Sequence, residues 1–270
     1  MGDKTKIDWA DATWNPVTGC LHGCEYCYAR RIAERFEARE IYDPECQCQR
    51  LLIERGMLKG TGKPLELDYP LEQKNKDGSI TNAAYPFGFE PTFHRYRLDE
   101  PKRWKKPRTI FVCSMADLFG DWVPDDWIEQ VFEACESAPQ HRYLFLTKNP
   151  ARLCKMASAG ILPYHDNWWF GSTLDSKNAK RFQGGLIYHT FSSIEPLTEH
   201  MHVGLGSFGS DEWVIIGAET GNRKGKIIPK REWVENVVES AQITGMKVFM
   251  KESLRGLMGD DFRQEFPWEV

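Results

Sequence analysis

The sequence predicts an α/β fold: a partial (open) parallel β/α barrel of six or seven units with an insertion after the first helix. Apolar, β-branched segments alternate along the chain with helical patterns, which is typical of parallel strands joined by crossover helices. The 270 residues supply fewer such units than a closed eightfold barrel contains. Residues 40–108 are rich in Pro, Gly and charge and interrupt the alternation. We therefore expect a single domain over residues 1–270, with 40–108 as an insertion within it.

The predicted elements follow one another in regular order. A short first strand at 7–13 precedes a group of cysteines. Six further strands are predicted at 109–114, 142–147, 168–173, 187–194, 212–218 and 247–252. Helices are predicted at 27–39, 125–137, 150–158, 176–182 and 231–244, several of them opened by a proline or a capping residue. Because ligands bind beyond the carboxyl ends of parallel strands, the chemistry is expected there.

The composition indicates a globular chain, with 41% hydrophobic and 27% charged residues. No apolar run reaches the length of a signal peptide or a membrane span, so we expect a cytoplasmic protein without membrane contact. In that reducing compartment the eight cysteines are expected to be thiols or metal ligands rather than disulfides. The net charge of −4 excludes a globally basic nucleic-acid binder, although it allows a local basic surface.

Three cysteines stand close together as C-x3-C-x2-C, namely Cys20, Cys24 and Cys27. A structural zinc site normally takes four ligands in two separated pairs, and His22 inside the loop is a cramped fourth ligand. Buried, unliganded thiols are a second alternative. A [4Fe-4S] cluster explains three thiols best, because the protein then holds three irons and leaves the fourth open to a substrate or cofactor.

With Tyr26 at its aromatic position, the motif resembles the C-x3-C-x-aromatic-C cluster motif of the radical SAM superfamily. The stretch "NPVTGCLHGCEYCYAR" is similar to the cluster loop of the spore photoproduct lyase group. The whole chain resembles a phage-associated family of radical SAM-like proteins of unassigned activity. This resemblance implies a partial β/α barrel and S-adenosyl-L-methionine bound at the open iron. It also implies reductive cleavage to a 5′-deoxyadenosyl radical, a one-electron donor of the flavodoxin or ferredoxin type, and no obligate protein partner.

The resemblance also implies cofactor-binding residues. Ser114 and Asp117 correspond to a serine-and-aspartate stretch of the lyase group, and Lys148 to a lysine that faces the carboxylate of the cofactor. The Gly-Gly-Glu element that holds the methionyl ammonium in many members is absent. Ser172 is a candidate ribose or carboxylate contact, with an ordinary turn serine as the alternative. Glu219, in a segment that resembles the one beside adenine, is either a site residue or a helix-cap carboxylate.

Weaker candidates lie elsewhere in the chain. Glu195 and Lys251 fall at predicted strand ends, where they either contact substrate or cap turns. Cys46 and Cys48 form a C-x-C in the insertion, but the sequence does not indicate the four convergent thiols that an auxiliary cluster needs.

Residues 93–108 carry seven Lys and Arg against two acids, interleaved with aromatic residues. Cations on phosphates and rings against stacked bases are typical of a nucleic-acid groove. A solvated charged connector is the alternative. The candidate nucleic-acid patch consists of Arg95, Arg97, Lys102, Arg103, Lys105 and Lys106.

Taken with the resemblance, these features predict a radical SAM enzyme that modifies a nucleic-acid base, such as a pyrimidine in phage DNA. Repair of a lesion is less favoured, because no motif locates a cysteine that would quench the substrate radical. The same chemistry on a small molecule or a protein is one alternative, with the insertion as a lid. A non-catalytic iron–sulfur partner or sensor protein is the other.

Overall fold

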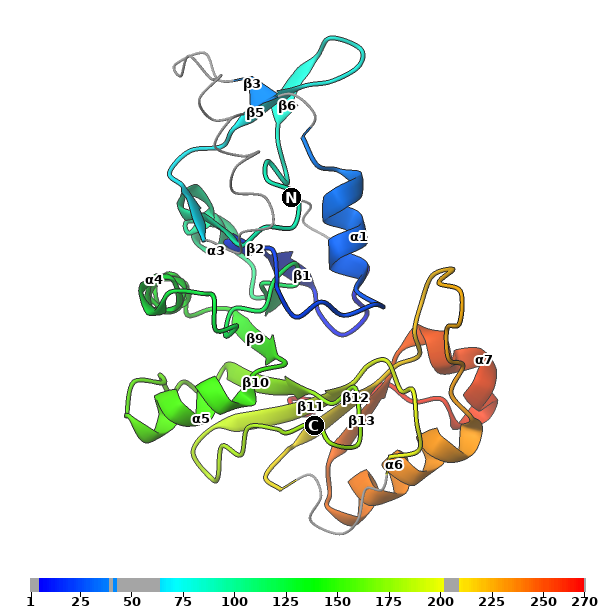
Figure 1. The fold of residues 1–270 in the computed structure, drawn as a ribbon. Coiled ribbons are helices and arrows are strands. Elements are labelled where there is room, and N and C mark those ends of the chain that lie inside the picture. The colour runs from blue at the N-terminus through cyan, green and yellow to red at the C-terminus, as the bar shows by residue number, and fades with distance from the viewer. Residues whose placement is uncertain (1–4, 39–40, 43–63, 202–208, 270) are drawn as a thin grey trace. The chain divides into compact units, whose positions relative to one another are not determined.

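The computed structural model describes residues 5–38, 41–42, 64–201 and 209–269. Seven strands form one sheet in the order β1-β8-β9-β10-β11-β12-β13 (Figure 1). Their bounds are β1 (Ala12–Trp14), β8 (Thr109–Val112), β9 (Arg142–Thr147), β10 (Trp168–Thr173), β11 (His189–Ile194), β12 (Trp213–Ile216) and β13 (Lys247–Met250). The strands from β9 to β13 pair in parallel, and the order has two free ends. The prediction of an open parallel β/α barrel is confirmed.

The chain divides into two compact units, which are described in turn. Unit 1 consists of Met1–Ala12, Arg108–Phe111 and His141–Val270. Unit 2 consists of Thr13–Pro107 and Val112–Gln140, and it therefore contains nearly all of the predicted insertion.

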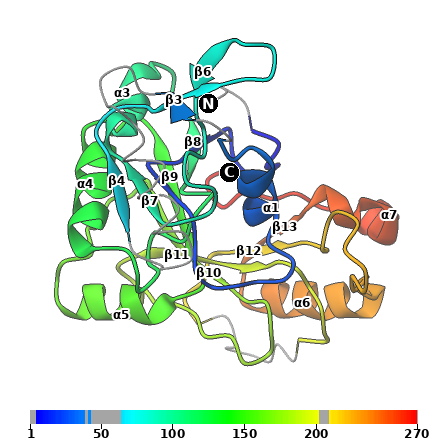
Figure 2. The same ribbon diagram turned by 45° about the horizontal axis from the view of Figure 1, so that its top comes forward.

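One face of the sheet in unit 1 is covered by helices. Helices α5 (Pro150–Ser158) and α6 (Arg231–Ile243) lie on the same side of the strands (Figures 1 and 2). Because successive side chains of a strand point to opposite faces, every second residue can pack against a helix. Ile194, Ile216 and Met250 do so in one cluster with residues of α6 such as Val237.

The opposite face of this sheet carries a second, aromatic cluster. Its buried members are Trp9, Phe111, Leu144, Trp169, Phe191, Trp213, Ile215 and Phe249. Phe266 and Trp268 near the C-terminus pack against it. Their segment also pairs with β13, since Glu265 donates its backbone N–H to the carbonyl of Val248 at 3.0 Å. Short helical turns, η2 (Glu252–Leu254), α7 (Arg255–Met258) and η3 (Gly259–Asp261), connect β13 to this segment.

The helix expected over 176–182 is absent, and these residues form a loop. Ser172 fixes the loop, because its Oγ accepts the backbone N–H of Phe182 at 2.8 Å. The ring of Phe182 packs edge-on against Phe170, with centroids 6.3 Å apart. An anchor at one residue of β10 thus overrides a weak local helical pattern.

Asp211 is a buried carboxylate on the helix-covered side of unit 1. Its partner is the hydroxyl of Ser192, which donates a hydrogen bond to Oδ2. Burial raises the pKa of Asp211 to about 6, although hydrogen bonds from Ser192 and Thr190 and the charge of Arg181 oppose that rise. The folded chain therefore holds this proton to a higher pH than the unfolded chain does.

Replacement of Asp211 by Asn is expected to flatten the pH dependence of stability. Between about pH 4 and pH 6 the unfolded carboxyl has released its proton and the folded one has not, so the free energy of unfolding falls as pH rises. A group of this kind accounts for a fall of about 2–3 kcal/mol, which the variant should lack. Urea unfolding across this range measures it, with the surface variant Asp260→Asn as control. An unchanged pH profile in Asp211→Asn would contradict the assignment.

The described residues of unit 2 form two small sheets and three helices. One sheet has the order β2-β7-β4 and the other β3-β5-β6. The strands are β2 (Val17–Thr18), β3 (Ile41–Tyr42), β4 (Leu65–Leu67), β5 (Glu72–Lys74), β6 (Ile80–Asn82) and β7 (Thr92–His94). The helices are α1 (Tyr28–Arg35), α3 (Glu100–Arg103) and α4 (Asp125–Glu136), with a 3-10 turn, η1, at Arg95–Arg97. Trp127 of α4 stacks on Phe93 of β7, with centroids 5.1 Å apart.

Residues 43–63, which include Cys46 and Cys48, lie outside the described residues, so the C-x-C motif is not placed. Across the residues that are described, no helix combines the length and apolarity needed to cross a membrane.

Candidate functional site

The cysteine loop, residues 19–27, is anchored in unit 2 at its first residue. Gly19 donates its N–H to the carbonyl of Met115 at 2.9 Å, and Cys20 donates to the carbonyl of Phe89 at 3.3 Å. Gly19 has a φ of +87°, and a Cβ built there would lie 2.2 Å from the carbonyl oxygen of Glu90. Only glycine fits this position, because both the conformation and the close approach exclude a side chain.

None of the three thiols of the loop is in a disulfide, and all three are half-buried. Cys20 and Cys27 pack against an apolar cluster that includes Phe89 and Met115. Cys27 is also the N-cap of α1, since its Sγ accepts the N–H of Arg30 at 3.3 Å. The loop thus presents sulfur atoms at the boundary of an apolar core and at a helix N-terminus.

The pKa of Cys20 is raised to about 12, and burial is the largest cause. The nearby groups Asp117, Cys27 and Cys24 also raise this pKa, whereas the backbone N–H of His22 lowers it. The thiols are therefore close enough to repel one another as thiolates. A bound metal centre would remove this repulsion, because it replaces the thiol protons with positive charge.

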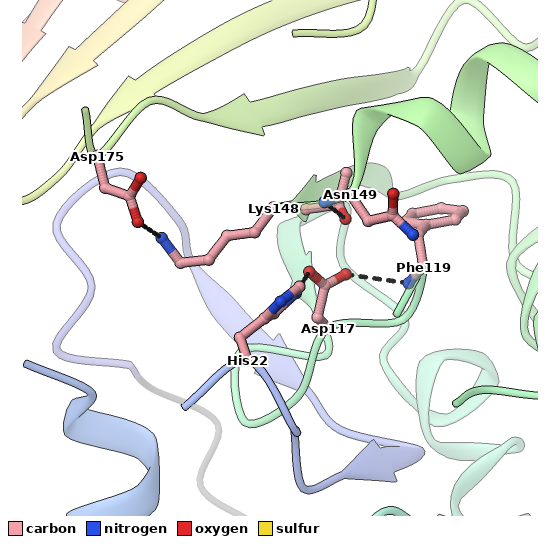
Figure 3. Close-up of polar contacts among 7 residues, drawn as sticks. His22, Asp117, Phe119, Lys148, Asn149 and Asp175 are labelled. Carbon is pink, nitrogen blue, oxygen red and sulfur yellow. Dashed lines mark hydrogen bonds and ion pairs between the residues drawn. The ribbon is translucent and has the colours of Figure 1, made fainter. Parts of the chain in front are cut away.

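A histidine and a buried aspartate form a pair beside the cysteine loop (Figure 3). Asp117 Oδ2 lies 2.7 Å from His22 Nε2, and Asp117 Oδ1 accepts the N–H of Phe119 at 3.1 Å. The ring of His22 stands edge-on to Trp122, with centroids 4.9 Å apart. Asp117 is a candidate cofactor contact by its sequence position, and in the structure its carboxylate contacts His22. The sequence carried no signal for this pair, because the two residues are 95 positions apart.

Ser114 lies in a turn that starts at the end of β8. Cys113 has a φ of +57°, which is uncommon for a residue other than glycine and is retained at functional sites more often than elsewhere. Ser114 Oγ donates to Asn15 Oδ1 at 3.2 Å, and the Ser114 carbonyl accepts the hydroxyl of Tyr28 at 2.8 Å. Tyr26 is half-buried within the loop. Unit 2 thus brings together the three cysteines, Tyr26, Ser114 and Asp117.

Metal-binding geometry is not preformed. In residues 5–38, 41–42, 64–201 and 209–269, no group of three or more His, Cys, Asp or Glu side chains is arranged to hold a metal ion. A single zinc ion needs its ligand atoms within about 2.0–2.3 Å of one point. The three thiols are therefore neighbours without forming a closed site for one ion.

In unit 1, Lys148 follows β9 and forms an ion pair. Its Nζ donates to Asp175 Oδ2 at 2.6 Å, and both side chains are partly exposed (Figure 3). Lys148 continues the alternation of Leu144 and Leu146, and it therefore lies on the aromatic face of the sheet. Asp175 is not among the residues predicted from the sequence, although its position just after β10 is the signal that identified the other strand-end candidates.

Glu195 and Lys251 also meet in unit 1. Lys251 Nζ donates to Glu195 Oε1. The end of β12 lies between these two residues, and there Gly217 leaves room for both side chains. The two strand-end candidates therefore form one charge pair.

Ser172 and Glu219 do not join these groups. Ser172 is 1% exposed and holds the backbone of Phe182 on the helix-covered side of the sheet. Glu219 does not cap a helix, because the next helix, α6, begins only at Arg231. Its buried carboxylate accepts two hydrogen bonds from the partly exposed Arg223, at 2.6 and 2.7 Å. Both side chains have local structural partners that the sequence pattern did not indicate.

The basic segment of unit 2 is only partly exposed. Arg95 is bound to Glu66 at 2.8 Å and to Asp68 at 2.6 Å. Arg97 is 4% exposed and donates to the carbonyls of Asn15 and Ala84. Both arginines therefore have partners within unit 2. The exposed cations of the predicted patch are Lys102, Arg103, Lys105 and Lys106.

Comparison with known proteins corrects one expectation. No curated protein and no solved structure matches the chain. The expected membership of the radical SAM superfamily, the spore photoproduct lyase-like group and the phage-associated radical SAM-like family is wrong. The family model that matches is a different one, and the described residues lack a formed cluster of metal ligands. A match over residues 4–256 shows that the chain belongs to the family described as "Protein of unknown function (DUF5131)".

Proposed function

We propose that this protein is an iron–sulfur enzyme in which Cys20, Cys24 and Cys27 hold a [4Fe-4S] cluster with one iron open to S-adenosyl-L-methionine, and that it modifies a nucleic-acid base. The observation that carries the proposal is the set of three half-buried thiols, none of them in a disulfide, on one anchored loop. Three thiolates fit a cluster with one open iron better than a closed single-ion site. The cluster assignment rests on the donor set alone.

Held by Cys20, Cys24 and Cys27, such a cluster would supply one-electron reduction of S-adenosyl-L-methionine and, through it, hydrogen-atom abstraction from the substrate. A one-electron donor of the flavodoxin or ferredoxin type is required as a partner. The chain's own residues hold and shield the sulfur atoms. The N–H of Arg30 at the start of α1 donates a hydrogen bond to Cys27 Sγ at 3.3 Å. Phe89 and Met115 keep water from one side of the loop.

The proposal is tested by anaerobic reconstitution with iron and sulfide. After addition of dithionite and S-adenosyl-L-methionine, mass spectrometry is expected to detect 5′-deoxyadenosine. A reconstituted protein that binds iron and sulfide but forms no 5′-deoxyadenosine would favour the non-catalytic iron–sulfur partner or sensor. A protein that takes up no cluster would refute both.

The proposed nucleic-acid substrate is supported by the four exposed cations at 102–106. Lys102 has only a long contact, 3.9 Å, with Asp99. Such cations are available to phosphate groups, and each contact releases counterions when it forms.

Neutralising Lys102, Arg103, Lys105 and Lys106 together is expected to weaken DNA binding and to flatten its salt dependence. Each phosphate contact that is lost should reduce the slope of log affinity against log salt by about 0.9 on duplex DNA. Fluorescence anisotropy of a labelled duplex at several salt concentrations measures the slope. As control, Lys74 and Lys76 in the β5–β6 hairpin are neutralised, with no change in slope expected. An unchanged slope in the quadruple variant would show that the segment is a solvated connector.

The second candidate function is the same chemistry on a small molecule or a protein. It is favoured by the internal partners of Arg95 and Arg97, which leave the patch smaller than its sequence indicates. Formation of 5′-deoxyadenosine without any binding to DNA at low salt would select this candidate.

A further inference from the structure

The Glu195–Lys251 pair stands at the carboxyl end of the parallel sheet in unit 1. Backbone hydrogen bonds between neighbouring strands continue beyond the strand ends as far as this pair. Gly217 donates its N–H to the carbonyl of Ile194 at 3.1 Å, and Lys251 donates to the carbonyl of Ile216 at 2.8 Å. The ends of parallel strands are where α/β proteins bind ligands.

A packed, buried layer lies directly below the pair. Ser193 pairs in register with Ile215, and Ile215 pairs with Phe249. These three residues are at most 1% exposed. Glu195 and Lys251 stand two residues further along the same strands and therefore on the same face. The pair thus forms the outermost layer above a buried interior. Hydrogen bonds to charged groups are stronger there than in open water.

Each partner retains hydrogen-bonding capacity. The ion pair through Glu195 Oε1 is the one side-chain polar contact that either residue makes within the described part of the chain. The exposed fractions of the Lys251 and Glu195 side chains are 19% and 28%. Lys251 Nζ therefore has N–H donors to spare, and Glu195 Oε2 has open acceptor positions. The pairs Lys148–Asp175 and Glu219–Arg223 differ, since Asp175 and Glu219 each have further interactions.

Gly217 keeps the centre of this layer clear. A Cβ built at Gly217 would lie 2.8 Å from Lys251 Cδ and 3.3 Å from Glu195 Cδ. Gly217 has no positive φ, so glycine is needed here for the space that it leaves and not for its backbone conformation.

We propose that Glu195 and Lys251 bind the hydrogen-bonding edge of the substrate base, a proposal that rests on the function proposed above. Outside their own ion pair, Glu195 offers an acceptor and Lys251 offers a donor beside it. Their complement is a neutral edge that carries an N–H next to a carbonyl or ring nitrogen. The lactam or amidine edge of a pyrimidine has this arrangement. A trans peptide bond directs its N–H and C=O to opposite sides, and it does not match.

A neutral ligand also leaves the ion pair intact, whereas a zwitterion would have to separate it. Reaching this edge requires the base to be unpaired, as in other enzymes that act on an extruded base.

The test uses thymidine as the probe, with N3-methylthymidine as the matched ligand that lacks the N–H. Binding to the purified full chain is measured by saturation-transfer NMR and titration. Thymidine is expected to bind at least about tenfold more tightly than N3-methylthymidine, because the methylated base leaves the carboxylate without its donor. Equal binding of the two, or no binding of thymidine, would overturn the proposal.

Three variants locate the site. Glu195→Gln and Lys251→Met are expected to weaken thymidine binding about tenfold or more, since each removes a charged hydrogen-bonding partner. Gly217→Ala should also weaken it, because the new methyl group displaces the Lys251 side chain. The control is Glu252→Gln, which removes the carboxylate of the neighbouring exposed Glu252–Arg255 pair and should leave binding unchanged. Wild-type affinity in a folded Lys251→Met variant would refute the assignment.

The two proposals fail independently. Selective thymidine binding without 5′-deoxyadenosine formation would refute the proposed chemistry and leave this site standing. Formation of 5′-deoxyadenosine by a protein that binds thymidine and N3-methylthymidine equally would refute the site alone. Equal affinity for a free α-amino acid and for thymidine would assign the pair to a zwitterion and overturn the proposal.

Discussion

Replacing Cys24 by alanine is expected to abolish the visible iron–sulfur absorbance of the reconstituted protein, together with 5′-deoxyadenosine formation. A cluster that has only three protein thiolates cannot lose one and remain firmly bound. The same loss is expected for Cys20→Ala and Cys27→Ala. Iron and sulfide content, measured beside the absorbance, shows whether the cluster itself has been lost.

The matched control for this experiment is Cys154→Ala. Cys154 is an exposed thiol on α5 in unit 1, far in sequence from the loop. Its replacement should leave cluster content at the wild-type level. Full cluster content in Cys24→Ala would show that the three-cysteine assignment is incorrect.

The second large effect is expected from Gly19→Ala, which should lower the free energy of unfolding by about 3 kcal/mol or more. The φ of +87° disfavours alanine, and the added Cβ would stand 2.2 Å from the carbonyl oxygen of Glu90. A backbone atom cannot move aside as a flexible side chain can, so the loop or residues 89–91 must shift. Chemical denaturation of unit 2, followed by tryptophan fluorescence, measures the loss.

Gly23→Ala is the control within the same loop. Gly23 has a φ of +71°, but a Cβ there meets nothing within 4 Å. Its replacement should therefore cost only about 1–2 kcal/mol, the cost of the left-handed conformation alone. Equal losses in the two variants would show that the contact with Glu90 is unimportant.

The fold could be predicted wherever a segment carries its own pattern. The predicted strands at 142–147 and 168–173 coincide with β9 and β10, and the predicted helix at 150–158 coincides with α5. Their apolar runs and caps are local features. The helix expected at 176–182 failed because a distant serine fixes the chain as a loop. The first strand begins at Ala12 rather than at residue 7, since its bounds depend on pairing with β8.

The candidate site follows the same rule. The cysteine loop could be identified because its three thiols lie within eight residues. Asp117 was identified as a candidate, but its contact with His22 was not, because a sequence pattern does not pair residues 95 positions apart. Arg95 was interpreted as a surface cation, whereas Glu66 and Asp68 reach it from 29 and 27 positions earlier in the chain. Long-range charge pairing is what the sequence leaves open.

The division of the chain sets the order in which its two units can fold during synthesis. Unit 2 is complete once residue 140 has been made, so it can fold while later residues are still being added. The aromatic cluster of unit 1 includes Trp9 and Phe111, which are made early, but it closes only when Phe266 and Trp268 arrive. In the interval, large aromatic side chains of unit 1 are without their partners. Unit 1 is therefore the part of the newly made chain that most needs protection by chaperones from aggregation.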